Sequence, residues 1–223
     1  MQVKQIKEFE PFDESDETLF QRIARDIEIQ GYSICPHALN PALVESLYRH
    51  QLGLKDEQVQ KAGIGRGEDY LKNHFIRRNK ICWINGESSA GQAWLSWTAG
   101  LKTFLNRRLF LGLFSFESHF AHYRPGDFYR RHYDAFRGEA NRVLSVVAYF
   151  NSNWTSSDGG ELVLYKNEDD REGIKVFPLL GTLVVFLSEE FPHEVLPAKR
   201  DRYSIAGWFR VNASRENMVD PPF

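Results

Sequence analysis

Apolar residues recur every three or four positions in three stretches of the first half of the chain, which predicts three amphipathic helices. The first is expected over residues 15–31, where Gly31 is a typical C-terminal cap. The second is expected after Asn40-Pro41, because a capping residue there precedes a proline suited to the first helical position. The third and longest is expected over about residues 89–109.

A glycine-rich, basic stretch separates the second and third predicted helices. Glycines loosen the backbone here, and we interpret residues 55–80 as a mobile loop that leads into a strand over 81–84 and a turn at Asn85-Gly86. The residues that give the stretch this character are Gly63, Gly65, Gly67, Arg66, Arg77, Arg78 and Lys80.

After residue 110 the pattern changes to short strands separated by Pro-Gly, Asp-Gly-Gly and Leu-Gly turn signals. The expected strands cover residues 114–123, 129–133, 143–150, 161–165, 176–178, 182–187, 194–197 and 203–211. Eight short strands after a helical half predict an α+β fold with a mainly β core. The architecture expected is a jelly roll buttressed by N-terminal helices.

The length of 223 residues indicates one domain. Within it, we expect helical support and the mobile loop over about residues 15–110, and the jelly-roll catalytic core over about 111–212. Seventeen phenylalanines favour a thick apolar core and a lined pocket.

Net charge and hydropathy narrow the class of partner. A formal charge of -2 gives no general attraction to nucleic acid or to an anionic membrane. No apolar run approaches the roughly 18 residues of a membrane span, and the N-terminus has no apolar signal segment, so a cytoplasmic protein is expected. Cys35 and Cys82 are two thiols that suit a reducing compartment, although a single bridge between them stays open.

Two histidines and one aspartate are candidates for a metal site. His132 and Asp134 are two positions apart on a predicted strand, so both side chains project to one face. His193 lies near a later strand and offers a third ligand. Two imidazoles and one carboxylate form the facial triad of non-haem iron(II) oxygenases. The His-x-Asp pair alone is weak evidence, since two surface histidines and a turn aspartate would also produce it.

Arg202 adds a second chemical function on the next strand. An arginine of this kind is commonly paired with an internal Glu or Asp. The predicted strands over 143–150 and 182–187 contain no acid, however, so a buried Arg202 lacks an obvious partner within them unless a ligand supplies a carboxylate. Tyr149 could add a hydroxyl to the same carboxylate, although an ordinary strand aromatic would explain it equally well. Iron ligands beside a carboxylate-binding arginine indicate a 2-oxoglutarate-dependent iron oxygenase.

The other histidines are interpreted as structural. His119 and His122 lie on opposite faces of one strand, and His122 is the residue that could mimic a metal ligand.

The residues in this order resemble the catalytic domain of prolyl 4-hydroxylases. The similarity covers roughly residues 30–211 and includes Tyr123-Arg124-Pro125-Gly126, Tyr129, His132-Tyr133-Asp134, Tyr149, Gly159-Gly160-Glu161-Leu162, Pro192-His193-Glu194-Val195, Arg202-Tyr203-Ser204 and Trp208. Residues 78–86 resemble the loop-to-strand segment of the hypoxia-inducible-factor-type prolyl hydroxylases and their bacterial relatives.

The resemblance implies a double-stranded β-helix and a set of residue roles. Iron(II) would be held by His132, Asp134 and His193. The 5-carboxylate of 2-oxoglutarate would be held by Arg202 and Tyr149, with Tyr123 near the other end of this cosubstrate. The substrate pocket would be lined by Tyr129, Trp208 and Arg78, and the basic loop over about 62–80 would fold over the substrate.

The implied reaction is O2-dependent hydroxylation of a prolyl residue at C4 in a protein, with formation of succinate and CO2. A bacterial translation factor is a candidate substrate, and a requirement for ascorbate as reductant stays open. The tail after Val211 is short and polar, whereas the animal enzymes use a helical C-terminal segment for substrate binding. This difference leaves the substrate open but not the chemistry.

Two other functions are compatible with the sequence. The same iron chemistry could act on a nucleobase or small molecule, with Arg66, Arg77, Arg78, Arg130 and Arg131 binding phosphate; the net charge disfavours nucleic acid. A non-catalytic, cupin-like binding or scaffold protein is the other alternative. It would have no reason to keep the triad together with Arg202.

Overall fold

The computed structural model describes residues 15–61, 77–135 and 141–212. Residues 1–14 and most of the predicted basic loop, 62–76 with Arg66, lie outside this description. None of the described helices is long and apolar enough to cross a membrane.

All three predicted helices are confirmed as α1 (Asp16–Gln30), α2 (Pro41–Leu52) and α3 (Ser89–Leu109). Gly31 ends α1 with φ 80°, a left-handed conformation that glycine adopts without strain. Asn40 Oδ1 accepts a hydrogen bond from Ala42 N at 2.8 Å and so caps α2. The caps explain why the sequence located the helix ends closely.

Two antiparallel sheets form the double-stranded β-helix. The larger sheet has the order β1-β9-β6-β11-β4-β3-β2, and the smaller has the order β5-β10-β7-β8. The strands of the larger sheet are β1 (Tyr32–Cys35), β2 (Gln60–Lys61), β3 (Lys80–Trp83), β4 (Ser115–Tyr123), β6 (Arg142–Tyr149), β9 (Leu183–Leu187) and β11 (Arg202–Arg210). Those of the smaller sheet are β5 (Tyr129–His132), β7 (Leu162–Leu164), β8 (Ile174–Val176) and β10 (His193–Val195).

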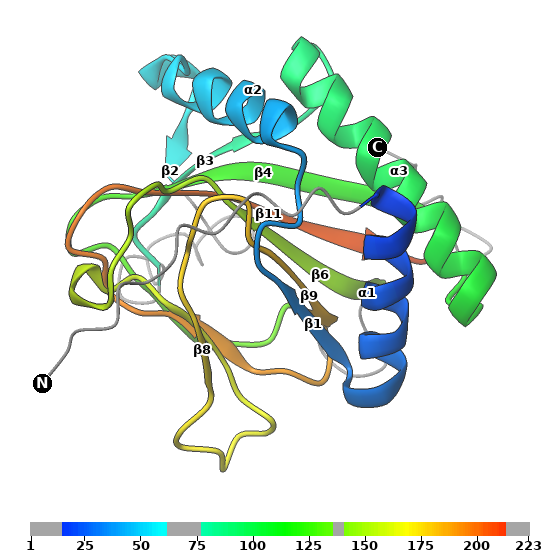
Figure 1. Ribbon diagram of the computed structural model, residues 1–223. Coiled ribbons are helices and arrows are strands. Elements are labelled where there is room, and N and C mark those ends of the chain that lie inside the picture. Colours follow the sequence, from blue (N-terminus) through cyan, green and yellow to red (C-terminus); the bar gives the residue numbers. More distant parts are fainter. Residues whose placement is uncertain (1–14, 62–76, 136–140, 213–223) are drawn as a thin grey trace, which may run out of the picture.

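The larger sheet buries both of its faces, and each face has its own core. The three helices pack on one side of it (Figure 1), and their apolar faces meet strand residues such as Leu144, Ile205 and Phe209. The other face turns toward the smaller sheet, where Tyr123, Tyr149 and Phe186 belong to the second cluster. Because side chains alternate along a strand, each long strand contributes to both cores.

Strand register lines up the side chains that face the smaller sheet. Arg202 is paired with Tyr123 of β4, and Ser204 is paired with Tyr149 of β6. Further along β11, Ala206 is paired with His119 and Trp208 with Ser145. This row of paired positions lies on the face of the larger sheet that turns toward the smaller sheet.

Two predicted strands are displaced toward the N-terminus. The strand expected at 176–178 is Ile174–Val176, and the one expected at 194–197 is His193–Val195. Both expected ends are prolines, Pro178 and Pro197, which have no N–H to donate to a ladder. Part of the stretch expected as loop is also ordered, since a short 3-10 helix at Asp56–Gln58 precedes β2. Cys35 and Cys82 are free thiols.

Core packing against the helices should dominate stability. Leu101 of α3 is fully buried in the helix-side core, so Leu101→Ala should lower the free energy of unfolding by about 2–5 kcal/mol. Leu52 is 52% exposed, and Leu52→Ala should stay within about 0.5 kcal/mol of the wild type. Urea denaturation of both variants measures this; equal destabilisation by the two would contradict the packing described.

Candidate active site

The smaller sheet brings His132, Asp134 and His193 together. His132 ends β5 and is paired directly with His193, which begins β10. Asp134 follows two residues after His132, with its Oδ1 3.6 Å from His132 Nε2 and its Oδ2 3.4 Å from His193 Nε2. One ligand atom from each residue lies within 4.8 Å of the other two, a group able to hold a metal ion.

Backbone carbonyls orient both imidazoles for metal binding. The oxygen of Arg130 lies 2.7 Å from His132 Nδ1, and that of Phe191 lies 3.0 Å from His193 Nδ1. A carbonyl can only accept, so each Nδ1 carries the hydrogen and each Nε2 offers a lone pair toward Asp134. Burial lowers the pKa of His193 to about 4, which keeps this ring neutral at pH 7.

Asp134 is held as an anion by its neighbours. Ser145 Oγ donates to Asp134 Oδ2 at 2.7 Å, and Ser188 Oγ lies 2.9 Å from Ser145 Oγ. Burial alone would raise the pKa of Asp134, but the attraction of the His193 and His132 rings in their protonated forms and the hydrogen bond from Ser145 outweigh it and lower the pKa well below its usual range. The carboxylate is therefore charged and oriented without a metal.

Arg202 is buried between the two sheets, and its guanidinium could bind an anion. It is 1% exposed, and its Nε donates to Gly160 O at 2.8 Å and its Nη1 to Ser204 Oγ at 3.2 Å. Within the described part of the chain, no carboxylate lies at ion-pair distance from it. Tyr149 packs against the guanidinium, 5.0 Å from ring centroid to Cζ, and its buried hydroxyl has no hydrogen-bond partner among the described residues. These groups fit a carboxylate of a ligand.

The glycine pair before β7 makes room for this arginine. A Cβ on Gly160 would lie 3.1 Å from Arg202 Cδ, and one on Gly159 would lie 2.4 Å from Pro197 O. Both glycines have positive φ, 70° and 68° respectively, so a side chain would be strained at either position.

Most of the other predicted pocket residues lie near the candidate metal site, but one is exposed. Tyr129 stacks on His132 with ring centroids 3.5 Å apart. The Tyr123 ring lies 4.8 Å from Arg202 Cζ, and burial raises the pKa of its hydroxyl. Trp208 is buried, and its Nε1–H makes no hydrogen bond within residues 15–61, 77–135 and 141–212. Arg78, in contrast, is exposed and lies over Phe128.

Its neighbour Arg77 reaches inward instead. Arg77 Nη2 lies 3.4 Å from His119 Nε2, its Nε donates to Asn79 at 2.7 Å, and its guanidinium lies 4.8 Å from the Tyr129 ring. Alternation from Ile81, which is buried, would have placed residues 77 and 79 on the inner face, and this signal was available in the sequence.

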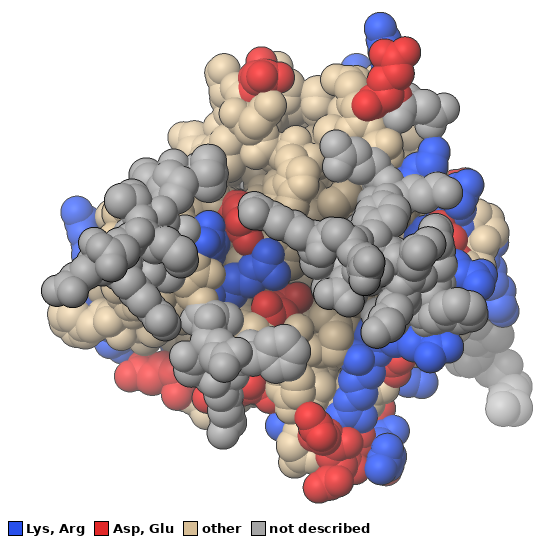
Figure 2. All heavy atoms as spheres, turned by 180° about the vertical axis from the view of Figure 1, so that it is seen from behind, with Lys and Arg blue, Asp and Glu red and all other residues tan. Residues whose placement is uncertain are grey.

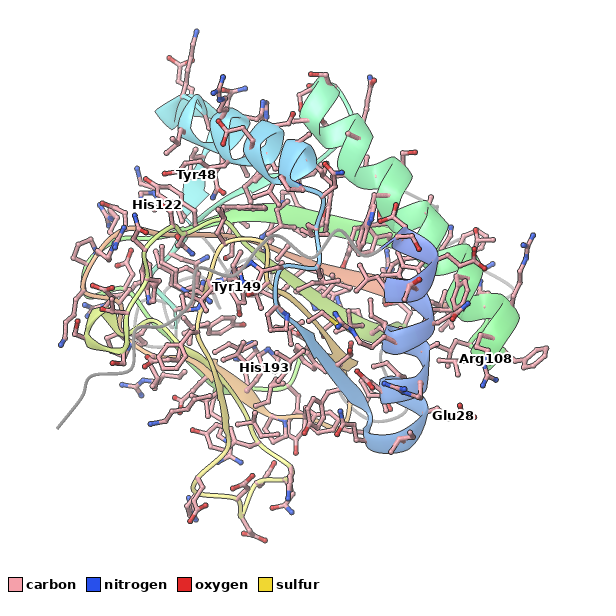
Figure 3. All side chains as sticks on the ribbon, in the orientation of Figure 1. Glu28, Tyr48, Arg108, His122, Tyr149 and His193 are labelled. Atoms are coloured by element: carbon pink, nitrogen blue, oxygen red, sulfur yellow. The ribbon has the colours of Figure 1, made fainter. Side chains whose placement is uncertain are left out.

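His122 does not join the metal group. Its Nε2 lies 2.7 Å from Asp201 Oδ1 and its ring stacks on Tyr203. Figure 3 shows His122 near Tyr48, apart from Tyr149 and His193, which point into the space between the two sheets. The expectation of a structural role for His122 agrees with this position.

Comparison with known proteins agrees with this geometry. The family model of the 2OG-Fe(II) oxygenase superfamily matches residues 118–210, a segment that contains the triad and Arg202. A hypoxia-inducible factor prolyl hydroxylase of Caenorhabditis elegans is 34% identical over 80 residues, 35% of this chain. The match spans only 11% of that relative's own length.

Solved structures match over much more of the chain. A prolyl-4-hydroxylase of Pseudomonas putida is 39% identical with a TM-score of 0.76, covering 87% of this chain and 100% of its own. A prolyl hydroxylase of Trichoplax adhaerens, solved with a peptide fragment of the hypoxia-inducible factor oxygen degradation domain, is 27% identical with a TM-score of 0.74. It covers 87% of this chain and 90% of its own. The chain therefore belongs to the prolyl hydroxylase type of 2-oxoglutarate and iron(II)-dependent oxygenases.

Proposed function

We propose that this protein is a 2-oxoglutarate and iron(II)-dependent dioxygenase that hydroxylates a prolyl residue at C4 in a protein, forming succinate and CO2. The observation that carries the proposal is the buried triad next to Arg202, a buried cation with no acidic partner among the described residues. The peptide in the Trichoplax adhaerens structure supports a protein substrate. A translation factor remains our candidate for it.

Each residue of the site has a role in this proposal. His132, Asp134 and His193 hold iron(II), which supplies the activation of O2 together with oxidation of the cosubstrate. The 5-carboxylate of 2-oxoglutarate is bound by the guanidinium of Arg202 and the hydroxyl of Tyr149. Tyr123 sits along the cosubstrate, while Tyr129 and Trp208 line the pocket and exclude water.

The alternatives lack a supporting observation of this kind. A scaffold would leave the buried Arg202 and the Tyr149 hydroxyl uncompensated, which costs folding free energy. A nucleobase substrate would be served by a basic surface, but acidic side chains lie among the basic ones on the face in Figure 2.

The first experiment measures cosubstrate binding without oxygen. Iron(II)-loaded protein plus 2-oxoglutarate should give the weak visible charge-transfer band of a bidentate 2-oxo acid. Arg202→Met should weaken 2-oxoglutarate binding about 100-fold or more, because a charge-assisted fork is lost. Arg202→Lys keeps the positive charge but not the forked pair of donors. Its affinity for 2-oxoglutarate should therefore lie between those of the wild type and Arg202→Met. If folded, metal-loaded wild-type protein gave no such band, the result would favour a non-catalytic scaffold protein over an enzyme.

Substrate hydroxylation is then followed by mass spectrometry. Proline-containing peptides of translation factors should gain one oxygen atom on proline, and succinate should accumulate in step with it. Asp134→Ala should abolish both, because it removes the one anionic ligand of the triad. Persistent 2-oxoglutarate turnover by this variant would refute the assignment of Asp134.

Ser145 should act as a positioning residue for the metal. Its hydrogen bond orients Asp134, so Ser145→Ala should weaken iron(II) affinity by about 10- to 100-fold. Ser145→Thr retains the hydroxyl and should preserve most of the affinity. Anaerobic titration with iron(II) tests this directly, and indistinguishable affinities for the alanine variant and the wild type would rule the role out.

A further inference from the structure

His119 is a buried histidine on the interior face of the larger sheet that the proposed iron site does not use. It is 2% exposed and is paired with Ala206 of β11 and Trp83 of β3. Its ring makes edge contacts with Trp208, at 5.6 Å between centroids, and with Trp83, at 5.3 Å. The ring is thus held between two tryptophans rather than in the helix-side core.

Arg77 sets which ring nitrogen of His119 carries the hydrogen. A guanidinium can only donate, so His119 Nε2, 3.4 Å from Arg77 Nη2, is the acceptor. Burial, reinforced by Arg77, lowers the pKa of His119 to about 3, and the ring is neutral at pH 7. Nδ1 of the neutral ring is therefore an N–H donor.

Neither this donor nor its neighbour is paired with another described residue. His119 Nδ1 and Trp208 Nε1 are both buried without a hydrogen bond to any other residue in the described part of the chain, and their two rings touch each other. A buried unpaired donor costs folding free energy, so native proteins rarely leave one without a partner from the protein, from water or from a ligand. Two adjacent donors indicate an oxygen acceptor of a bound molecule.

Strand register places the donors at a useful distance from Arg202. The Arg202 guanidinium bonds to Ser204, and Ala206, the partner of His119, lies two residues further along β11. Two residues of strand span about 7 Å, which is comparable with the length of a five-carbon dicarboxylate. Trp208 is paired with Ser145 of β6, whose hydroxyl donates to Asp134, so the Trp208 position lies on the same face of the sheet as the group that holds this carboxylate.

We infer that His119 Nδ1–H and Trp208 Nε1–H bind the 1-carboxylate of 2-oxoglutarate, at the end opposite to Arg202. The inference rests on the proposed function and adds a second recognition point for the cosubstrate. The carboxylate accepts two hydrogen bonds from neutral donors, while Arg202 neutralises the distant end. His119 is then a cosubstrate-binding residue and no metal ligand.

A matched pair of variants tests this role. Asparagine keeps an N–H close to the position of Nδ1, whereas leucine has the same branching and no donor. In anaerobic, iron(II)-loaded protein, His119→Leu should raise the Kd for 2-oxoglutarate about 10- to 100-fold, and His119→Asn should stay close to the wild type. Iron(II) affinity should be the same in all three proteins.

The outcomes separate this inference from the proposed function. A leucine variant with the wild-type Kd, or an asparagine variant as impaired as leucine, would overturn the role of the Nδ1 donor. A wild type that shows no 2-oxoglutarate complex would instead reject the proposed function itself.

Wild-type protein offers a test that does not depend on how the variants fold. With zinc(II) as a diamagnetic replacement, nitrogen-15 NMR should show His119 in the Nδ1–H form. Addition of 2-oxoglutarate should move this N–H proton resonance downfield. An Nε2–H tautomer, or a resonance that does not respond to saturating 2-oxoglutarate, would contradict the inference.

Discussion

One backbone pair, His132 opposite His193, determines the geometry on which the site depends. Because β5 and β10 are antiparallel neighbours, this pairing fixes the separation of the two imidazoles independently of any metal. Carbonyls two residues earlier, from Arg130 and Phe191, then turn both rings the same way. The two candidate imidazole ligands are thus arranged by the ladder of the smaller sheet.

The larger sheet supplies the other half of the site and explains why the helices are needed. Its interior face carries polar groups such as Arg202, Ser145 and His119, which contribute little to hydrophobic stabilisation. The opposite face of the same strands buries a large apolar cluster against α1, α2 and α3. Packing on the helix side therefore offsets the cost of keeping unsatisfied donors and a buried cation on the other side.

Local sequence signals were sufficient for the elements and for the triad. Caps such as Asn40 and Gly31 located the helices. Period-two alternation together with His-x-Asp predicted that His132 and Asp134 lie together as candidate metal ligands. The ends of two strands were wrong because the pattern was followed onto prolines, which cannot donate to the ladder.

These local sequence signals did not predict contacts between segments that are far apart in the sequence. The pairing of His119 with Ala206 and the approach of Arg77 to His119 depend on strand register, which the hydrophobic pattern alone does not specify. The Ser145 bond to Asp134 joins residues on different strands in the same way. Alternation from Ile81 would have favoured Arg77 over Arg78 as the inward residue, a signal that the choice of Arg78 from the resemblance did not use.

The central place of β11 limits how the length of this chain can vary. β11 pairs with β4 along nine residues and with β6 on its other side, and its alternate residues serve the site and the helix-side core. Insertion or deletion of one residue within it would exchange the two faces, moving Arg202 or Trp208 into the apolar cluster and Ile205 into the pocket. Length changes among homologues should therefore collect in the connections between strands, and β11 should keep a constant length.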